Sequence, residues 1–109
     1  MTKVVLTKSN GRITEVNVEG HTGYAEHGQD IVCAALSATV QYAALGLKDI
    51  VGLDINLKQN DEKGTISFKL PQCMTEKQSV EANAILLTMR AGIADLVSGY
   101  PEFIKLEEK

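Results

Sequence analysis

The chain has 109 residues, which is room for one hydrophobic core, so we expect a single domain over residues 1–109. Its 44% hydrophobic and 23% charged residues argue against disorder, and its net charge of -3 argues against direct nucleic-acid binding, which usually needs a basic face. Two cysteines are too few for a disulfide framework, and the first residues show no signal-peptide pattern. We therefore expect a cytoplasmic protein with reduced thiols and no membrane association.

Residues 1–19 predict a β-hairpin. A short apolar run near the N-terminus is followed by Asn10-Gly11, a strong turn signal. Val16 and Val18 then alternate with polar residues, as in a half-buried strand. Ile13 falls out of this alternation, so the beginning of the second strand is not fixed by the pattern.

The next segment, residues 20–29, predicts a flexible loop that leads into a helix. It has no apolar periodicity, and it contains three glycines, Gly20, Gly23 and Gly28. Asp30 is a favourable N-cap residue, and the apolar segment after it predicts a helix to about Asp49. Because this segment carries Ala, Leu and Val on all sides, we expect it to be the central buried helix.

The second half of the chain predicts another hairpin, another helix and a last strand. Apolar residues alternate at 53–57 and at 66–70, on either side of a polar turn at 59–64. A capping box begins a helix at Thr75, and a short strand is expected at 103–106. Apolar residues recur along the helix at helical spacing: Val80, Ala84, Leu87, Ala91 and Ala94.

The order of these elements is β-β-α-β-β-α-β. Strands that are joined mostly by hairpins, together with two helices, predict an α+β fold. We expect a two-layer sandwich in which a mixed or antiparallel sheet packs on two helices.

Residues able to carry chemistry lie around the start of the first helix. With Asp30 as N-cap, Cys33 is residue N3, where the helix dipole and unpaired N–H groups favour a thiolate, so we expect a lowered thiol pKa. His21 precedes Cys33 by twelve positions and could meet it if the loop folds back. A Cys–His pair is the arrangement that nucleophilic catalysis at sulfur requires. A small buried structural cysteine is the alternative interpretation.

Three neighbouring residues have less specific patterns. Asp30 can act as a helix cap or as a third group that orients His21, and we favour the cap. Ser37 follows Cys33 by one helical turn and lies on the same face, where it could hold a hydrogen bond near the site or bond the preceding turn. His27 is expected to be exposed. His21, His27 and Cys33 lack the spacing of a zinc site, so neither a metal nor a cofactor is expected.

The stretch Gly20-His21-x-x-Tyr24-x-x-x-Gly28-x-Asp30-Ile31-Val32-Cys33-Ala34 resembles the signature of the ribosomal-processing cysteine proteases, a family of small bacterial proteins. The resemblance extends over the whole chain in length and element order. It implies a homodimeric α+β protein in which Cys33 is the nucleophile and His21 is the general base and acid. Asp30 and Ser37 would be supporting residues. The implied substrate is the precursor of large-subunit ribosomal protein twenty-seven, which loses a short N-terminal extension ending in aromatic residues.

This interpretation predicts a mechanism. His21 takes the proton of Cys33, and the thiolate attacks the scissile carbonyl. N–H groups at the helix N-terminus, including that of Cys33, stabilise the oxyanion, while the loop glycines let the loop open and close over a peptide. A mildly acidic protein also suits a basic ribosomal protein as its partner.

Two other functions fit the residues. One is a non-catalytic ribosome-assembly or peptide-binding module with an incidental cysteine. The other is a redox sensor based on Cys33, although Cys73 has no motif that marks it as a resolving partner. We expect Cys73 to be structural or an incidental surface thiol.

Overall fold

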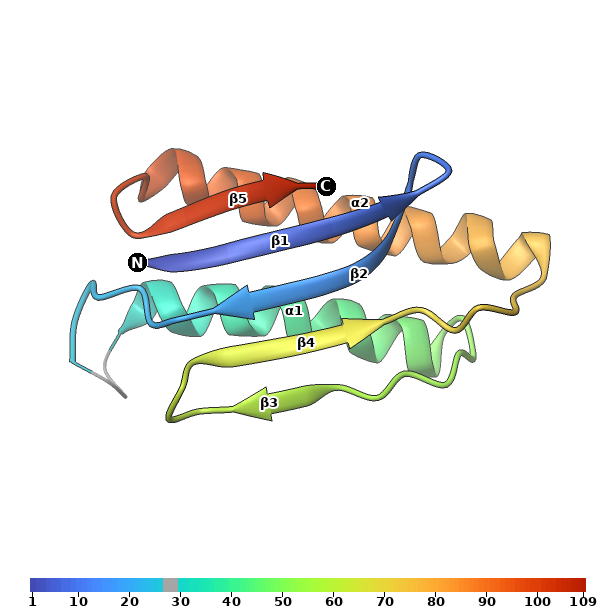
Figure 1. Ribbon diagram of the computed structural model, residues 1–109, viewed down its shortest axis with the longest axis horizontal. Helices are drawn as coiled ribbons and strands as arrows, with labels where there is room; N and C mark the ends of the chain where they lie inside the picture. Colours follow the sequence, from blue (N-terminus) through green and yellow to red (C-terminus); the bar gives the residue numbers. More distant parts are fainter. Residues whose placement is uncertain (27–29) are drawn as a thin grey trace.

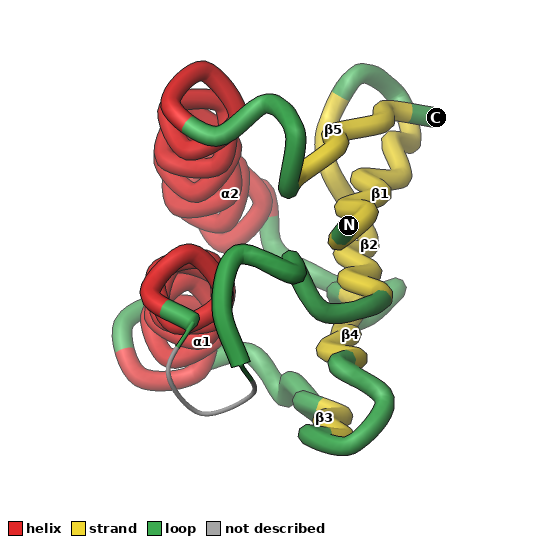
Figure 2. The backbone as a smooth tube through the Cα atoms, turned by 90° about the vertical axis from the view of Figure 1, so that its left-hand side faces the viewer, coloured by secondary structure: helices red, strands yellow, loops and turns green. Residues whose placement is uncertain are grey.

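In the computed structural model, which describes residues 1–26 and 30–109, one mixed sheet is covered on one face by two helices (Figures 1 and 2). The strand order is β3-β4-β2-β1-β5, in which β5 runs parallel to β1 and the other neighbouring strands run antiparallel. The elements are β1 (Thr2–Ser9), β2 (Arg12–Glu19), α1 (Ile31–Asp49), β3 (Lys58–Asn60), β4 (Thr65–Lys69), α2 (Glu76–Gly99) and β5 (Ile104–Glu108). The predicted α+β two-layer sandwich is confirmed.

The β1–β2 hairpin contains a β-bulge that explains the irregular apolar pattern. Asn10 and Gly11 have φ values of 54° and 79°, the left-handed conformation that a tight hairpin turn of this kind requires. The ladder pairs Thr7 with Glu15 but Lys8 with Ile13, so one extra residue is inserted in β2. Ile13 therefore returns to the core side and is buried.

The predicted strand at 53–57 is wrong, and β3 is shorter and later than expected. Residues 52–57 are in no strand, and pairing with β4 begins only where Lys58 faces Ser67. Leu53 and Ile55 are nevertheless buried. The alternation thus indicates an extended segment with one side toward the core. Both a paired strand and an unpaired extended segment have this property.

Helix α1 is not central but lies beside α2 in the helical layer (Figure 2). Its core-facing residues include Val32, Leu36 and Val40, whereas Tyr42 is 71% exposed and Leu45 is 49% exposed. The expectation of burial on all sides is therefore wrong, because a helix in a two-layer fold has one face without a covering layer. By length and composition alone α1 could cross a membrane, which is weak evidence because core helices of soluble proteins pass the same test.

Helix α2 begins as predicted but turns a different face to the core. Thr75 and Gln78 form the reciprocal capping box. The stripe that predicted the helix is exposed throughout, with Val80 at 50% and Leu87 at 47% exposure. The buried face consists instead of Ala82, Leu86, Met89 and Ile93. Both faces carry apolar residues at helical spacing, so the periodicity identified the helix but not its buried side.

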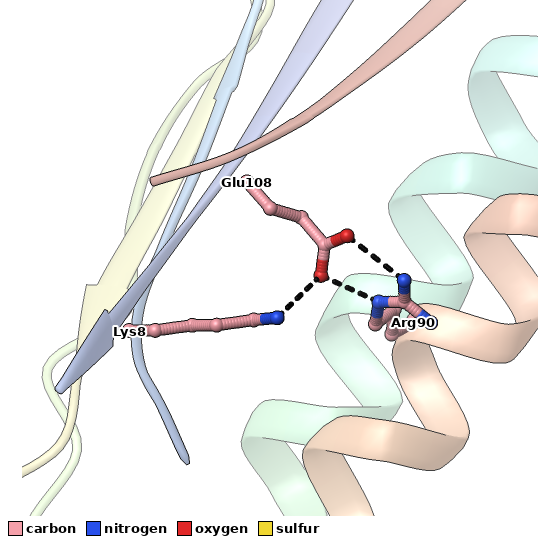
Figure 3. Close-up of polar contacts among 3 residues, drawn as sticks. All are labelled: Lys8, Arg90 and Glu108. Carbon is pink, nitrogen blue, oxygen red and sulfur yellow. Dashed lines mark hydrogen bonds and ion pairs between the residues drawn. The ribbon is translucent and has the colours of Figure 1, made fainter. Parts of the chain in front are cut away.

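Strand β5 is joined to the rest of the domain by ion pairs as well as by its ladder. The carboxylate of Glu108 accepts two hydrogen bonds from Arg90 on α2, at 2.6 and 2.8 Å, and pairs with Lys8 on β1 at 3.1 Å (Figure 3). The two cations hold the pKa of Glu108 at about 2. Sheet and helical layer are thereby connected where β5 ends.

Candidate active site

Three segments meet at one end of the sheet: the end of β2, the start of α1 and the β3–β4 turn (Figure 1). Between them is a cavity of about 430 Å³. All four residues that the sequence predicted as catalytic or supporting line this cavity. Its lining is His21, Ala25, Asp30, Cys33, Ala34, Ser37 and Asp61.

Cys33 is half-buried at position N3 of α1. Burial raises the pKa of its thiol, and the negative charges of Asp30 and Asp61 raise it further. A hydrogen bond from the main chain of Thr22 acts in the opposite direction, but the pKa of Cys33 stays above its ordinary value. The predicted lowering of this pKa is therefore wrong, because burial and two carboxylates outweigh the hydrogen bond from the main chain of Thr22. The thiol is protonated at neutral pH, so a base has to remove its proton before it can attack.

Asp30 is buried and caps the helix, as the sequence predicts. One oxygen, Oδ1, accepts the main-chain N–H of Cys33 at 2.9 Å. The other, Oδ2, accepts the N–H groups of Tyr24 at 3.0 Å and Ala25 at 3.3 Å and the hydroxyl of Thr22. Burial alone would raise the pKa of Asp30, but these four hydrogen bonds hold it below its ordinary value. Asp30 is thus a charged group that joins the loop to the helix.

The cap has a consequence for the predicted oxyanion site. The N–H of Cys33 already donates to Asp30, so the expectation that it stabilises an oxyanion is not supported. The main chain of Thr22 lies within hydrogen-bonding reach of the sulfur instead. This donor was missed by sequence reasoning, because Thr22 belongs to a loop whose path no pattern predicts.

His21 lies two residues after the end of β2. Its Nε2 atom lies 2.9 Å from the main-chain oxygen of Glu62 in the β3–β4 turn. The preceding residue, Gly20, has φ 86°, and its carbonyl accepts the hydroxyl of the buried Thr2 at 2.8 Å. Two separate parts of the chain, β1 and the β3–β4 turn, therefore contact the Gly20–His21 segment and define where the imidazole lies.

The loop after His21 also contacts the segment between α2 and β5. The ring of Tyr24 packs edge-on against Tyr100 and Phe103, with centroids 5.6 and 5.4 Å apart. Gly23 has φ 77°, which favours glycine. Gly28 and His27, which the sequence singled out, lie outside the described residues. His27 is also one of the three residues of the alternative metal set. Flexibility of this loop stays a prediction.

The remaining candidate residues differ in whether they line the cavity. Ser37 lines the cavity one turn after Cys33, on the face predicted for it. Cys73 is exposed and does not line it, as expected for an incidental thiol. Asp61 was missed: in the sequence it is one of several polar residues of a turn, and only the fold shows that it lies beside Cys33. A smaller hollow of about 60 Å³ shares His21, Cys33, Ser37 and Asp61 with this cavity.

Comparison with known proteins gives consistent matches over nearly the whole chain. The sequence model of a family described as cysteine protease Prp matches residues 1–105. The ribosomal processing cysteine protease Prp of Staphylococcus aureus is 26% identical over 105 residues, covering 96% of this chain and 95% of that protein. The same-named protein of Bacillus subtilis is 23% identical over 107 residues, covering 97% and 96%. A crystal structure of the S. aureus protease with a covalently linked product peptide superposes with a TM-score of 0.87, at 27% identity and full coverage of both chains.

Proposed function

Because this chain belongs to the cysteine protease Prp family, we propose that it removes the N-terminal extension from the precursor of large-subunit ribosomal protein twenty-seven. The observation that carries the proposal is the cavity that His21 and Cys33 line together. A base and a thiol at one cavity are the minimum for acyl transfer through sulfur. The names of the relatives, which are ribosomal processing proteases, support a ribosomal protein as substrate.

In the mechanism that we propose, Cys33 and His21 act as a dyad. Because burial and two carboxylates raise the pKa of the Cys33 thiol, His21 acts as a general base that takes the proton during attack. The thiolate attacks the scissile carbonyl, and the N–H of Thr22 donates to the developing oxyanion. His21 then protonates the leaving amine, and water hydrolyses the thioester. Ser37 supports the site from the next turn of the helix.

The charges around the cavity favour a basic substrate. Asp30 is held in its charged form, and Asp61 adds a second carboxylate at the same cavity. A peptide from a basic ribosomal protein would bring compensating positive charge, and the chain as a whole has a net charge of -3. The carboxylates would then contribute to binding while they restrain the reactivity of the free thiol.

We also propose that the protein is a cytoplasmic homodimer. Both helices expose large apolar side chains: Tyr42 and Leu45 on α1, and Val80 and Leu87 on α2. Exposed apolar residues that form one patch mark association surfaces, and the proposed dimer would use these residues in that way. A Leu87→Glu variant should be monomeric in analytical ultracentrifugation if α2 contributes to the dimer, whereas a wild-type monomer would contradict the dimer itself.

The function is tested by mass spectrometry of the intact precursor after incubation with the purified protein. A single cut after the aromatic end of the extension is expected, and it should be lost in Cys33→Ala and in His21→Ala. Cys73→Ala is the matched control, since it removes the other thiol from an exposed position, and it should cut normally. Cleavage by a folded Cys33→Ala or His21→Ala variant would refute the dyad. No cleavage by the wild type would refute the substrate.

A further inference from the structure

The main-chain carbonyl of Glu62 contacts the imidazole of His21 across 41 positions of sequence. The distance from Nε2 to this oxygen is 2.9 Å, which is an ordinary hydrogen bond. A carbonyl oxygen only accepts, so the Nε2 atom must carry the proton. In a neutral imidazole that has its proton on Nε2, the lone pair available for taking a proton is on Nδ1. The contact therefore determines which ring atom can act as the base.

The register of the sheet brings the turn to this place. β2 and β4 pair with Val18 opposite Ile66, so two residues beyond the ladder Gly20 stands opposite Gly64. A Cβ atom on Gly64 would lie 2.8 Å from the Gly20 carbonyl carbon and 3.1 Å from His21 Cε1. Gly64 also has φ 65°, which L side chains rarely adopt. Only glycine lets the turn approach His21 this closely.

The turn itself has hydrogen bonds that define where its carbonyl lies. The N–H of Lys63 donates to the side-chain oxygen of Asn60 at 3.1 Å, and that of Gly64 donates to the Asp61 carbonyl at 3.3 Å. Asn60 and Thr65 form the last pair of the β3–β4 ladder. The position of the Glu62 oxygen is therefore set by the hairpin and not by the side chain of Glu62 itself, so a substitution at Glu62 alone would not remove the carbonyl.

We propose that the β3–β4 turn is the positioning element of the dyad: the Glu62 carbonyl holds His21 as the Nε2–H tautomer, so that Nδ1 takes the proton of Cys33. This proposal rests on the proposed dyad. A backbone carbonyl does here what a third side chain does in other acyl-transfer sites, where the orienting group fixes the tautomer of the histidine. Asp30, whose hydrogen bonds from described residues come from Thr22 and main-chain N–H groups, serves the loop and the helix.

The tautomer is measured by long-range ¹H–¹⁵N NMR on protein labelled at histidine, at a pH where the ring is neutral. The His21 signals are identified by their loss in His21→Gln. The expected result is a protonated Nε2 and an unprotonated Nδ1. A proton on Nδ1, or an equal mixture of both forms, overturns the proposal, and this result needs no variant of the turn to fold.

Gly64→Ala tests the approach of the turn. Gly52→Ala is the matched control, because Gly52 has a comparable φ of 81° but a Cβ there meets nothing within 4 Å. Both variants carry the cost of a left-handed alanine, and only Gly64→Ala displaces the turn from Gly20 and His21. We expect kcat to fall roughly 10-fold to 100-fold in Gly64→Ala relative to Gly52→Ala, with KM little changed, and the tautomer to become mixed. Equal kcat and an unchanged tautomer in the two variants overturn the proposal.

Failure of this proposal and failure of the proposed dyad give different results. If His21→Ala still cleaves the precursor, the dyad is wrong whatever the tautomer of His21. If His21→Ala is inactive but the ring carries its proton on Nδ1, the dyad stands and the role of the turn is wrong.

Discussion

Replacement of Asp30 by alanine tests whether one carboxylate holds both the helix and the loop of the site. The side chain accepts the N–H of Cys33 as an N-cap, and it accepts three more hydrogen bonds from the loop. Thr75→Ala at the other helix is the matched control, because the Thr75 hydroxyl caps α2 through the N–H of Gln78. The difference between the two variants isolates what the loop contacts add.

The expected magnitude follows from the environment of each partner. Loss of an N-cap costs about 1 kcal/mol, and Thr75→Ala should cost no more than that. In Asp30→Ala the buried hydroxyl of Thr22 also loses its acceptor, at about 1 kcal/mol. The N–H groups of Tyr24 and Ala25 are on exposed residues that water can reach, so together they add no more than about 1 kcal/mol. We expect Asp30→Ala to cost about 2–3 kcal/mol, a fall in Tm on the order of 10 °C.

Urea unfolding followed by circular dichroism measures both variants, first at neutral pH and then in acid. Because folding lowers the pKa of Asp30, its contribution is present above its ordinary value of 3.8 and is lost as the pH falls through the lower value of the folded state. The difference in free energy of unfolding between Asp30→Ala and wild type should therefore become smaller in acid. The difference between Thr75→Ala and wild type should not change with the titration of Asp30. Equal costs for the two variants at neutral pH would refute the reasoning and reduce Asp30 to a helix cap.

Two further predictions concern charges. Asp61→Asn should lower the pKa of the Cys33 thiol, because it removes one of the charges that oppose the thiolate; the pH dependence of iodoacetamide alkylation in a Cys73→Ala background measures it, and an unchanged midpoint would contradict the contact. Glu108→Gln should destabilise the protein above pH 4.5 and have progressively less effect toward pH 2, since Arg90 and Lys8 lower the pKa of Glu108 from 4.5 to about 2. Thermal melts over this range test the second prediction, and a difference that high salt does not reduce would speak against an exposed ion-pair network.

Local sequence patterns predicted the elements well where only one kind of structure gives rise to the pattern. The Asn10-Gly11 turn, the Asp30 cap and the Thr75 capping box all depend on backbone chemistry within a few residues, and all are present. Patterns that two different structures can produce gave wrong predictions. Alternation at 53–57 is shared by a strand and by an unpaired extended segment, and apolar residues lie on both faces of α2.

The same distinction explains which half of the site could be predicted. The cap, the cysteine and the serine lie on two successive turns of one helix, so their spacing predicted that they share a site, and the histidine precedes them by a loop short enough to fold back to them. The β3–β4 turn is a polar turn like many others, and nothing in its residues indicates a partner 41 positions away. Its place follows from the β2–β4 register, in which a shift by one residue would move Gly64 away from Gly20 and reverse every side chain of β4. Since the buried Ile66 and Phe68 allow only one of these registers, the hydrophobic core determines where the Glu62 carbonyl meets the histidine.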